Sequence, residues 1–334
     1  MPSLRAISEL MNGGLLLCLC VLAGLLLDRL LGEPKYGHPL VGFGRIATWL
    51  ETRLNQPINS RVSSRLNATI AVKALGLLAF LLATVPWLLL ASWLWWGLDL
   101  HWLWRCLIGS VAVYLAVGWQ SLELHVQAIV TALERGQLPQ AQKATGLIVS
   151  RDCESLSEEG VVRAATESLL ENTSDAVIAP LFWFAVAGVP GIVLYRLSNT
   201  LDAMWGYRNS RFVHFGWAAA RFDDGLNFIP ARISALALIV GALSLRGFAV
   251  WRQCACYWSS PNAGPVLAAG AGSLGIVLGG GASYHGVWQN KPATPGNAAT
   301  LNDLPRAIVL TRRAVIISAL ALLLASLLWR GCCS

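Results

Sequence analysis

Long apolar runs separated by short polar segments dominate this chain. The runs Leu10–Leu27, Ala74–Leu98 and Cys106–Leu122 approach or exceed the ~20 residues that cross a hydrocarbon core ~30 Å thick, and Ala314–Trp329 is a shorter run of the same kind. We predict membrane-spanning helices at these four runs, whereas Ile233–Leu245 is apolar but short. Because no small-residue cleavage site follows the first run, we expect it to be a retained anchor.

Composition agrees with a membrane protein, since 55% of the 334 residues are hydrophobic and only 13% are charged. The predicted fold class is all-α, a polytopic integral membrane bundle that forms one embedded domain over residues 1–334. The net charge of +7 suits loops on an anionic membrane surface. The arginines are spread along the chain and form no nucleic-acid patch, and the eight cysteines lack zinc-ligand spacing.

Basic residues predict how the chain is oriented in the membrane. The connection 99–105 holds one arginine, whereas the segment 29–73 holds several arginines and lysines. By the positive-inside rule the second segment is cytoplasmic and the first is not. The next two spans then return to the cytoplasm, so we expect residues 121–175 to form a cytoplasmic helical insertion.

A capping-box pattern, Ser155-x-x-Glu158, predicts a helix that runs to Asp175. Four charged side chains recur on this helix every four residues and share one face: Arg163, Glu167, Glu171 and Asp175. This face is either solvated and held by i,i+4 pairs or, because it leads directly into an apolar segment, part of a site.

The apolar stretch Ala176–Tyr195 lies between acidic blocks. It is long enough for one crossing, but it carries Pro180 and the helix breaker Gly188-Val189-Pro190-Gly191. If the acidic residues on its two sides build one site, the chain must cross the membrane an even number of times between them. We therefore predict a re-entrant hairpin, which is tolerated where protein covers its backbone.

More than half of the 18 acidic residues fall between Arg151 and Arg232, on either side of that stretch. A charge at bilayer depth costs ~2.5–3.5 kcal/mol on insertion scales, so acids and amides clustered there indicate a site. Their oxygens suit a divalent cation, and neighbouring arginines suit anionic substrate groups. The predicted metal ligands are Glu171, Asp175, Asp202, Asp223 and Asp224. The alternative is a set of salt bridges that tie loops to the membrane face.

Two further motifs have two interpretations each. Asp28 and His38 flank a proline-containing turn after the first run, where His38 is either a proton carrier or ligand or a hydrogen-bonded residue of a capped loop. Gly279-Gly280-Gly281 is interpreted as a packing element rather than a phosphate cradle, because the chain contains no Walker pattern.

Taken together, these motifs resemble the CobD/CbiB family of cobalamin biosynthesis, the adenosylcobinamide-phosphate synthases. The likeness follows the family in order over almost the whole chain. The segments that carry it are LDRLLGEPKYGHPLVGFGR (27–45), ESLLENTSDAVIAPLFW (167–183), YRLSNTLDAMWGYRNSRFVHFGWAAARFDDGLNFIPARI (195–233), SPNAGPVLAAGAGSLGIVLGG (260–280) and KP (291–292).

The resemblance implies a multi-pass enzyme of the bacterial inner membrane with its active site on the cytoplasmic side. It implies a ligase that uses ATP and Mg²⁺ to join the propionate carboxylate of adenosylcobyric acid to (R)-1-amino-2-propanol or its O-phosphate. The corrinoid and the amine are then small-molecule partners, and membrane lipid surrounds the chain. Self-association, or association with other enzymes of the pathway, stays open.

At the motif positions, acidic residues are expected to hold Mg²⁺ and orient phosphates: Glu167, Glu171, Asp175, Asp202, Asp223 and Asp224. Cations are expected to neutralise the triphosphate, an acyl phosphate or the amine's phosphate: Arg208, Arg221, Arg232 and Lys291. Asn172, Asn199 and Asn227 are expected to fix orientation. Asp28 and His38 are expected to line an entry loop or move the amine's proton.

Two other functions stay open. Membrane transferases of the prenyl or CDP-alcohol type also use spaced aspartates and Mg²⁺, although Glu167-x3-Glu171-x3-Asp175 is not their D-D-x-x-D pattern. A non-catalytic membrane sensor of the same ancestry is expected to have lost the acidic and asparagine positions, and all of them are present here.

Overall fold

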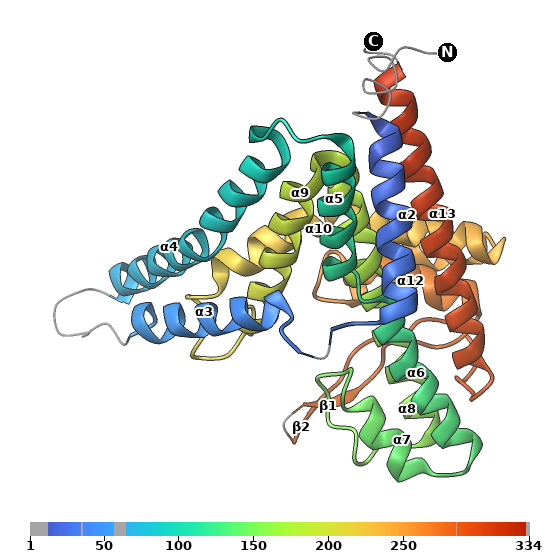
Figure 1. Ribbon diagram of the computed structural model, residues 1–334. Coiled ribbons are helices and arrows are strands. Elements are labelled where there is room, and N and C mark those ends of the chain that lie inside the picture. Colours follow the sequence, from blue (N-terminus) through green and yellow to red (C-terminus); the bar gives the residue numbers. More distant parts are fainter. Residues whose placement is uncertain (1–12, 35, 57–64, 285, 332–334) are drawn as a thin grey trace, which may run out of the picture. The chain divides into compact units, whose positions relative to one another are not determined.

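The structure is a computed structural model that describes residues 13–34, 36–56, 65–284 and 286–331, and it is helical almost throughout (Figure 1). In this part of the chain six helical segments are long and apolar enough to cross a membrane: Gly14–Leu31, Ala68–Gly97, Trp102–Glu134, Glu158–Trp205, Trp217–Ala242 and Asp303–Ser326. The predicted all-α, multi-pass membrane architecture is confirmed. Residues 10–12 of the first predicted run lie outside the described residues.

Two compact units divide the chain. Unit 1 consists of Met1–Val117, Pro180–Leu226 and Ala325–Ser334. Its helices are α2 (Gly14–Leu31), α3 (Pro39–Leu54), α4 (Arg65–Ser92), the π-helical turn η1 (Trp93–Gly97), α5 (Trp102–Ala116) and nearly all of α9 (Ala179–Trp205). The helix α10 (Trp217–Ala242) belongs to unit 1 through Leu226 and to unit 2 from Asn227.

Unit 2 consists of Gly118–Ala179 and Asn227–Leu324. Its elements are α6 (Trp119–Glu134), α7 (Leu138–Thr145), α8 (Glu158–Thr173), the π-helical turn η2 (Ser174–Ile178), α11 (Arg246–Cys254), η3 (Ala255–Tyr257), α12 (Ala263–Leu274), β1 (Ala282–Tyr284), β2 (Val287–Gln289) and most of α13 (Asp303–Gly331). Residues 121–175, predicted to form a cytoplasmic helical insertion, share unit 2 with Asn227–Leu324, and their position as a cytoplasmic insertion stays a prediction.

Helices α3, α4 and α9 meet in the core of unit 1, where Phe43, Phe80 and Trp205 are buried. Glycines permit this close packing. A Cβ atom at Gly76 would lie 2.0 Å from the Phe215 carbonyl oxygen, and one at Gly216 would lie 1.7 Å from the Trp205 carbonyl oxygen. Backbone approaches of this kind exclude any side chain at the two glycines, as in other helix contacts built on small residues.

The helix α9 is two helical arms joined at a sharp break. Ala187 (φ −134°, ψ 16°) and Gly188 (φ 61°, ψ −144°) are not helical, and the positive φ of Gly188 suits a residue without Cβ. Beyond the break, a Cβ at Gly191 would lie 2.2 Å from the carbonyl oxygen of Trp183, whereas eight residues of straight helix span ~12 Å. The arms therefore fold back on each other, as the predicted re-entrant hairpin requires. The side of a bilayer that each arm faces stays a prediction.

Helix α8 begins at Glu158 with Ser157 as its N-cap, whose side chain accepts a hydrogen bond from Gly160 N at 3.2 Å. The predicted cap at Ser155 was wrong by two residues, because Ser157 places its hydroxyl on the first unpaired N–H groups. The predicted end near Asp175 becomes a π-helical turn, η2, that leads into α9. Turns of this kind are rare in proteins, and those that occur are often found at functional sites.

Two predicted runs have different bounds in the structure. The run Cys106–Leu122 is not one helix, because α5 ends at Ala116 and α6 begins at Trp119. The short run at 233–245 is the end of the 26-residue helix α10. Pro230 lies inside α10 and leaves the carbonyl of Leu226 without its helical donor. Trp183 Nε1 donates to that carbonyl at 2.9 Å, so the helix continues through the proline.

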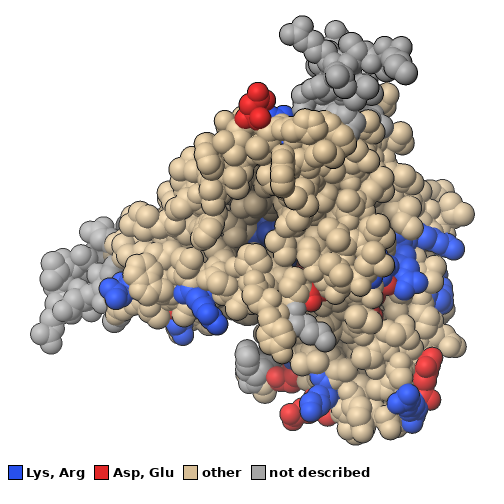
Figure 2. Space-filling model, viewed as in Figure 1, with Lys and Arg blue, Asp and Glu red and all other residues tan. Residues whose placement is uncertain are grey.

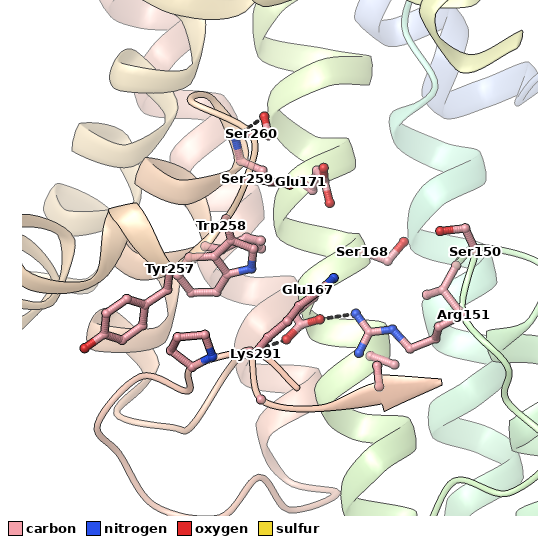
Figure 3. A pocket seen from close by; sticks show the side chains of 18 of the residues that line it. Ser150, Arg151, Glu167, Ser168, Glu171, Tyr257, Trp258, Ser259, Ser260 and Lys291 are labelled. Atoms are coloured by element: carbon pink, nitrogen blue, oxygen red, sulfur yellow. Dashed lines mark hydrogen bonds and ion pairs between the residues drawn. The ribbon is translucent and has the colours of Figure 1, made fainter. Parts of the chain in front are cut away.

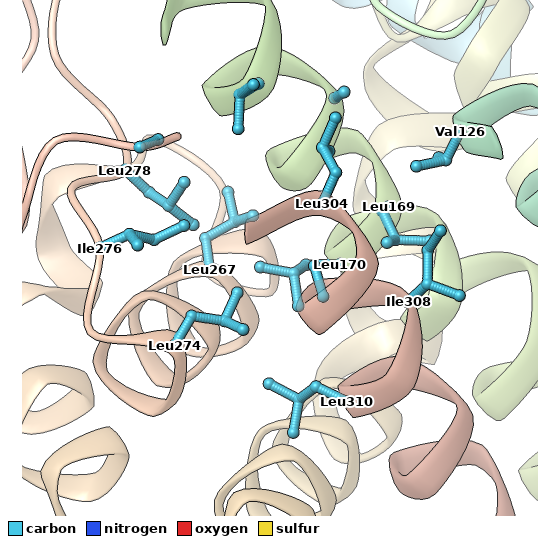
Figure 4. Close-up of a cluster of buried hydrophobic side chains, with 14 of the residues drawn as sticks. Val126, Leu169, Leu170, Leu267, Leu274, Ile276, Leu278, Leu304, Ile308 and Leu310 are labelled. Carbon is cyan, nitrogen blue, oxygen red and sulfur yellow. The ribbon is translucent and has the colours of Figure 1, made fainter. Parts of the chain in front are cut away.

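Unit 2 has its own apolar core, formed by α6, α8, α12 and α13 (Figure 4). Leu170 of α8 lies at its centre with Leu267 of α12 and Ile308 of α13 around it. A Cβ at Gly270 would lie 2.5 Å from Leu170 Cδ1, so the absence of a side chain at Gly270 permits α12 to pack closely against α8. This core holds α8 in place, and with it the acidic face of α8.

The surface separates into an apolar and a charged part. Figure 2 shows mainly tan side chains over α4 and α5, and blue and red side chains together over the end of unit 2 that carries α7 and the β1–β2 hairpin. Exposed apolar residues on α2, α4 and α5 include Leu26, Leu89 and Leu107, each more than half exposed. An apolar exterior of this extent is typical of helices that face lipid.

Candidate functional site

A polar cavity of about 500 Å³ lies within unit 2. Its walls come from the loop before α8, from α8 itself, from η3 and the residues after it, and from the segment around β1 and β2. Tyr257 and Trp258 lie on one side of Glu167, and Arg151 lies on the other (Figure 3). Three predicted acidic or amide residues of α8 and the predicted cation Lys291 line the same cavity: Glu167, Glu171, Asn172 and Lys291.

Glu167 is buried, and each of its two carboxylate oxygens has a partner. Its Oε2 forms an ion pair with Arg151 Nη2, and its Oε1 accepts a hydrogen bond from Gly279 N at 2.6 Å. A buried carboxylate held by a guanidinium and a backbone N–H is strongly fixed in position. Glu167 therefore joins α8 to the loop before it and to the glycine turn at Gly279.

Glu171 follows Glu167 by one helical turn, and its surroundings differ. Its side chain is exposed to the cavity. Its charged neighbours are Glu167, Arg151 and Lys291. An acid that opens into a cavity and has two cations among its electrostatic neighbours has the freedom to bind a metal or to accept a proton, which Glu167 lacks.

Asn172 and Ser168 form a small hydrogen-bonded group on the same wall. Asn172 Nδ2 donates to Ser168 O at 2.9 Å and to Ser168 Oγ at 3.1 Å, and Ser168 Oγ donates to Ile148 O at 2.6 Å. Because its amide nitrogen is committed, Asn172 presents its carbonyl oxygen as the atom that can accept from a ligand.

Sequence reasoning missed Asp152, which anchors the β1–β2 hairpin beside the cavity. Asp152 Oδ2 accepts hydrogen bonds from Ser283 Oγ at 2.7 Å and from Gly286 N at 2.8 Å, and Asp152 N donates to Ser283 O at 2.9 Å. Lys291 follows this hairpin directly. Burial raises the pKa of the neighbouring Cys153 thiol, which disfavours its thiolate form. No sequence signal marks Asp152, because its partners lie 131 and 134 residues away.

The glycine run predicted to serve packing has two roles. Gly281 does pack, since a Cβ there would lie 2.1 Å from the Trp288 ring. Gly279 and Gly280 instead line the cavity, and each has φ of +81°, a left-handed conformation that favours glycine. Gly280 N donates to Pro292 O at 2.9 Å, which places the turn directly beside Lys291.

A second acidic group lies within unit 1. Asp202 has Asp223 and Asp224 as its electrostatic neighbours. Asn199 Nδ2 donates to Asp223 Oδ1 at 3.3 Å. A Cβ at Gly206 would lie 2.0 Å from Asp202 Oδ1, so a glycine is required there for the carboxylate to keep its place. This group unites α9 with the first turns of α10.

The predicted cations have distinct surroundings. Arg221 is exposed and lies 3.9 Å from Asp224, and Arg208 also influences Asp224 electrostatically. Arg232, in unit 2, donates to Asn262 Oδ1 at 2.9 Å and to Pro261 O at 3.1 Å. The contacts of Arg232 hold the loop before α12, and its role toward phosphate stays a prediction.

The remaining predicted residues lie on α2, before α3, in η2 and on α10. Asp175 begins the π-helical turn η2. Asn227 is buried on α10, one turn after Asp223. Asp28 is fully buried on α2. His38 caps α3, with its Nδ1 accepting from Leu40 N at 3.2 Å, which agrees with the capped-loop interpretation.

His38 also lines a second cavity, which lies within unit 1 and has a volume of about 510 Å³. Its walls are almost entirely apolar and come from α3, α4, α5 and α9. The predicted meeting of all three acidic blocks around one cation stays a prediction, since the acids form two groups, one inside each unit.

The donor sets fit Mg²⁺, although no three His, Cys, Asp or Glu side chains converge to hold a metal among the described residues. Mg²⁺ commonly takes one or two protein carboxylates and completes its shell with water and phosphate oxygens. Glu171 in the cavity of unit 2, and Asp202 beside Asp223 and Asp224 in unit 1, are donors of this kind.

Comparison with known proteins gives the class of this chain. The family model described as CobD/Cbib protein matches residues 21–311. The chain therefore belongs to the CobD/CbiB family, and it is an enzyme of cobalamin biosynthesis, which confirms the resemblance.

Individual relatives agree with this assignment, and each is named cobalamin biosynthesis protein CobD. The relative from Chromobacterium violaceum is 48% identical over 305 residues, which are 91% of this chain and 95% of its own. That from Stutzerimonas stutzeri is 52% identical over 82% of this chain and 86% of its own. That from Mycobacterium tuberculosis strain H37Rv is 38% identical over 93% and 95%. No solved structure matches the chain significantly.

Proposed function

We propose that this protein is an amide ligase that uses ATP and Mg²⁺ to join the propionate carboxylate of adenosylcobyric acid to (R)-1-amino-2-propanol or its O-phosphate. The observation that carries the proposal is the cavity of unit 2, which Glu171 lines together with Arg151 and Lys291. Membership of the CobD/CbiB family indicates the pathway, which is cobalamin biosynthesis. We also propose that the enzyme lies in the bacterial inner membrane with this site toward the cytoplasm.

The chemistry of the reaction explains why such a site is suitable. A carboxylate does not condense with an amine until one of its oxygens becomes a leaving group, and ATP supplies the phosphoryl group for this. The attacking amine must be neutral, so one proton has to leave it during the reaction. Phosphate then departs as the carbon–nitrogen bond forms.

Residues of the cavity can be given parts in this reaction. Arg151 and Lys291 provide positive charge in the cavity that can bind the anionic groups of the substrates. Asn172 offers a carbonyl oxygen that can orient the amine. Glu171 is the acid able to take the amine's proton or to share Mg²⁺ with phosphate oxygens. Glu167, already paired, holds the cavity in shape. Mg²⁺, when bound, would supply charge neutralisation for the phosphates.

The test is a reaction with purified protein in detergent. Adenosylcobyric acid, ATP and Mg²⁺ are supplied with either (R)-1-amino-2-propanol or its O-phosphate, and the amide is identified by mass. An ATP-dependent product with one of the amines is expected. Absence of product with both amines, from protein shown to be folded, contradicts the ligase proposal.

The two other functions make different demands in the same assay. A transferase of the prenyl or CDP-alcohol type would release pyrophosphate or CMP without consuming ATP. A membrane sensor would consume nothing, and the presence of every acidic and asparagine position argues against it.

A further inference from the structure

Arg163 is a residue of the cavity region to which no part in the reaction has yet been given. It lies on α8 one turn before Glu167 and on the same face. Its Nη1 would lie 3.3 Å from a Cβ placed on Gly280, which lines the cavity. The guanidinium therefore touches the left-handed Gly279–Gly280 turn.

The Nε atom of Arg163 is buried and has no hydrogen-bond partner among the residues that the structure describes. Burying a guanidinium donor without an acceptor is unfavourable. The nearest carboxylate on its helix face, Glu167, is already held by Arg151 and by Gly279 N. An acceptor for Arg163 would therefore come from a ligand or from water.

A second cation belongs to the segment that hydrogen-bonds with the same turn. Gly280 N donates to Pro292 O at 2.9 Å, and Thr294 N donates to Leu278 O at 2.8 Å, so the segment after the hairpin runs beside the turn. Lys291 precedes Pro292 and lines the cavity. Arg163 and the segment that carries Lys291 thus both lie beside Gly280, where the missing side chain leaves space that Arg163 Nη1 occupies.

The charges around the cavity include cations that can hold an anion. Arg151, Arg163 and Lys291 stand against Glu167, Glu171 and Asp152. Glu167 is paired with Arg151, and Asp152 Oδ2 already accepts hydrogen bonds from Ser283 Oγ and Gly286 N. Tetrahedral anions with several acceptor oxygens match guanidinium and ammonium donors that converge from two sides.

We propose that Arg163 and Lys291, beside the Gly279–Gly280 turn, form a binding site for a phosphate group. This inference rests on the proposed function for the source of that phosphate, which is either the polyphosphate of ATP or the phosphate ester of the amine. The proposed pair differs from the arginines predicted from the sequence motifs, Arg208, Arg221 and Arg232.

The test measures binding in the absence of the corrinoid, so that it does not depend on turnover. Purified protein in detergent is titrated by calorimetry with ADP, with (R)-1-amino-2-propanol O-phosphate and with the unphosphorylated amine. The Arg163→Gln variant is expected to bind the correct phosphorylated probe about tenfold or more weakly, and Arg163→Lys is expected to recover part of the loss. The unphosphorylated amine is expected to bind both forms alike.

A matched control removes the same charge elsewhere in unit 2. Arg135→Gln changes an exposed arginine that follows α6, and it is expected to bind all three probes like the unchanged protein. Equal binding of both phosphorylated probes by Arg163→Gln and Arg135→Gln would overturn the proposal. The probe whose affinity falls, ADP or the amine phosphate, identifies the source of the phosphate.

A second variant changes a glycine of the turn instead of a charged side chain. Gly280→Ala places a methyl group 3.3 Å from Arg163 Nη1 and forces a left-handed conformation on alanine. Gly136→Ala is its control, because Gly136 has φ of +67° but nothing within 4 Å of a Cβ. Loss of phosphate binding in the first variant alone supports the site, and equal binding in both contradicts it.

The two proposals fail separately. If Arg163-dependent phosphate binding is found but no amide is ever formed, the ligase proposal is wrong and the phosphate site stands. If the amide forms and Arg163→Gln needs no more ATP or amine phosphate than the unchanged enzyme, the phosphate site is wrong and the ligase proposal stands.

Discussion

The two acidic groups of this protein differ in the charged side chains that surround them. In unit 2, Glu167 is clamped by Arg151 and Gly279 N, and Glu171 has Arg151 and Lys291 as its cationic neighbours. In unit 1, the electrostatic neighbours of Asp202 are two further acids, Asp223 and Asp224. In the first group cations act on both acids around a cavity. In the second, Arg221 and Arg208 act on Asp224, whereas the electrostatic neighbours of Asp202 are acids.

This difference indicates which kind of ion each group can bind. Like charges close together favour an added cation, so the aspartates of unit 1 are suited to Mg²⁺. Cations whose neighbouring carboxylates are already held by other donors can bind an added anion, so the cavity of unit 2 is suited to phosphate and carboxylate groups. The predictions below test this contrast, from the largest effect to the smallest.

The largest effect is expected at the aspartates. Asp223→Asn should lower amide formation by about 100-fold or more, because an amide oxygen binds Mg²⁺ far more weakly than a carboxylate oxygen. The measurement is product formation at increasing Mg²⁺ concentration, with membrane insertion unchanged. Asp99→Asn, at an exposed aspartate between α4 and α5, should be without effect. Near-normal turnover of Asp223→Asn would remove this residue from the metal site.

The second prediction compares two acids on one helix. Glu167→Gln should destabilise the protein by about 3–5 kcal/mol, since it leaves Arg151 buried without its charge partner. Glu171→Gln should change stability by no more than about 0.5 kcal/mol, because its side chain is exposed to the cavity. Unfolding of the detergent-solubilised variants measures both. Equal stabilities would mean that Glu167 is not the structural acid of the pair.

The third prediction concerns the hairpin. Asp152→Ala should raise the KM for the phosphorylated substrate about tenfold with a smaller change in kcat, because Lys291 loses the anchor of its segment. Amide hydrogen exchange in residues 282–291 should become faster. Glu154→Ala, at an exposed neighbouring acid, is the control. Unchanged exchange in Asp152→Ala would show that other contacts fix the hairpin.

The smallest effect, on stability, is expected at the pair of Glu51 and Arg211 in unit 1, which belongs to neither acidic group. Arg211 Nε and Nη2 donate to the Glu51 carboxylate at 3.0 and 2.6 Å, and these hydrogen bonds lower the pKa of Glu51 below its ordinary value. The contribution to stability is therefore complete above the ordinary pKa of about 4.3 and is lost as pH falls through the lower pKa of the folded protein.

The experiment follows the thermal midpoint of the solubilised protein between about pH 6 and pH 3.5. The unchanged protein should lose a few degrees more than Glu51→Gln, and the difference should be small because Arg211 is largely exposed. The same acid dependence in both proteins would assign it to other carboxylates.

Much of the architecture was predictable because it follows from local pattern. The apolar runs predicted spanning helices, and the structure has helices of suitable length and composition there. The breaker at 188–191 predicted a reversal, and Gly188 and Gly191 provide it. Boundaries were less certain, because caps and π-helical turns depend on single hydrogen bonds. Ser157 rather than Ser155 caps α8, and α10 begins at Trp217, with charged turns that precede the short apolar run at 233–245.

The sequence by itself determined which residue types are present, where the chain is apolar, and to which family it belongs. It placed Glu167 and Glu171 in one pattern and could not separate them. Only the tertiary structure decided that the first is clamped and the second opens into a cavity, because the clamp comes from Arg151 and from a backbone N–H 112 residues away. It likewise brought Asp152 to the hairpin and Arg163 to the glycine turn. Contacts of this kind arise when helices pack, and no local pattern in the chain specifies them.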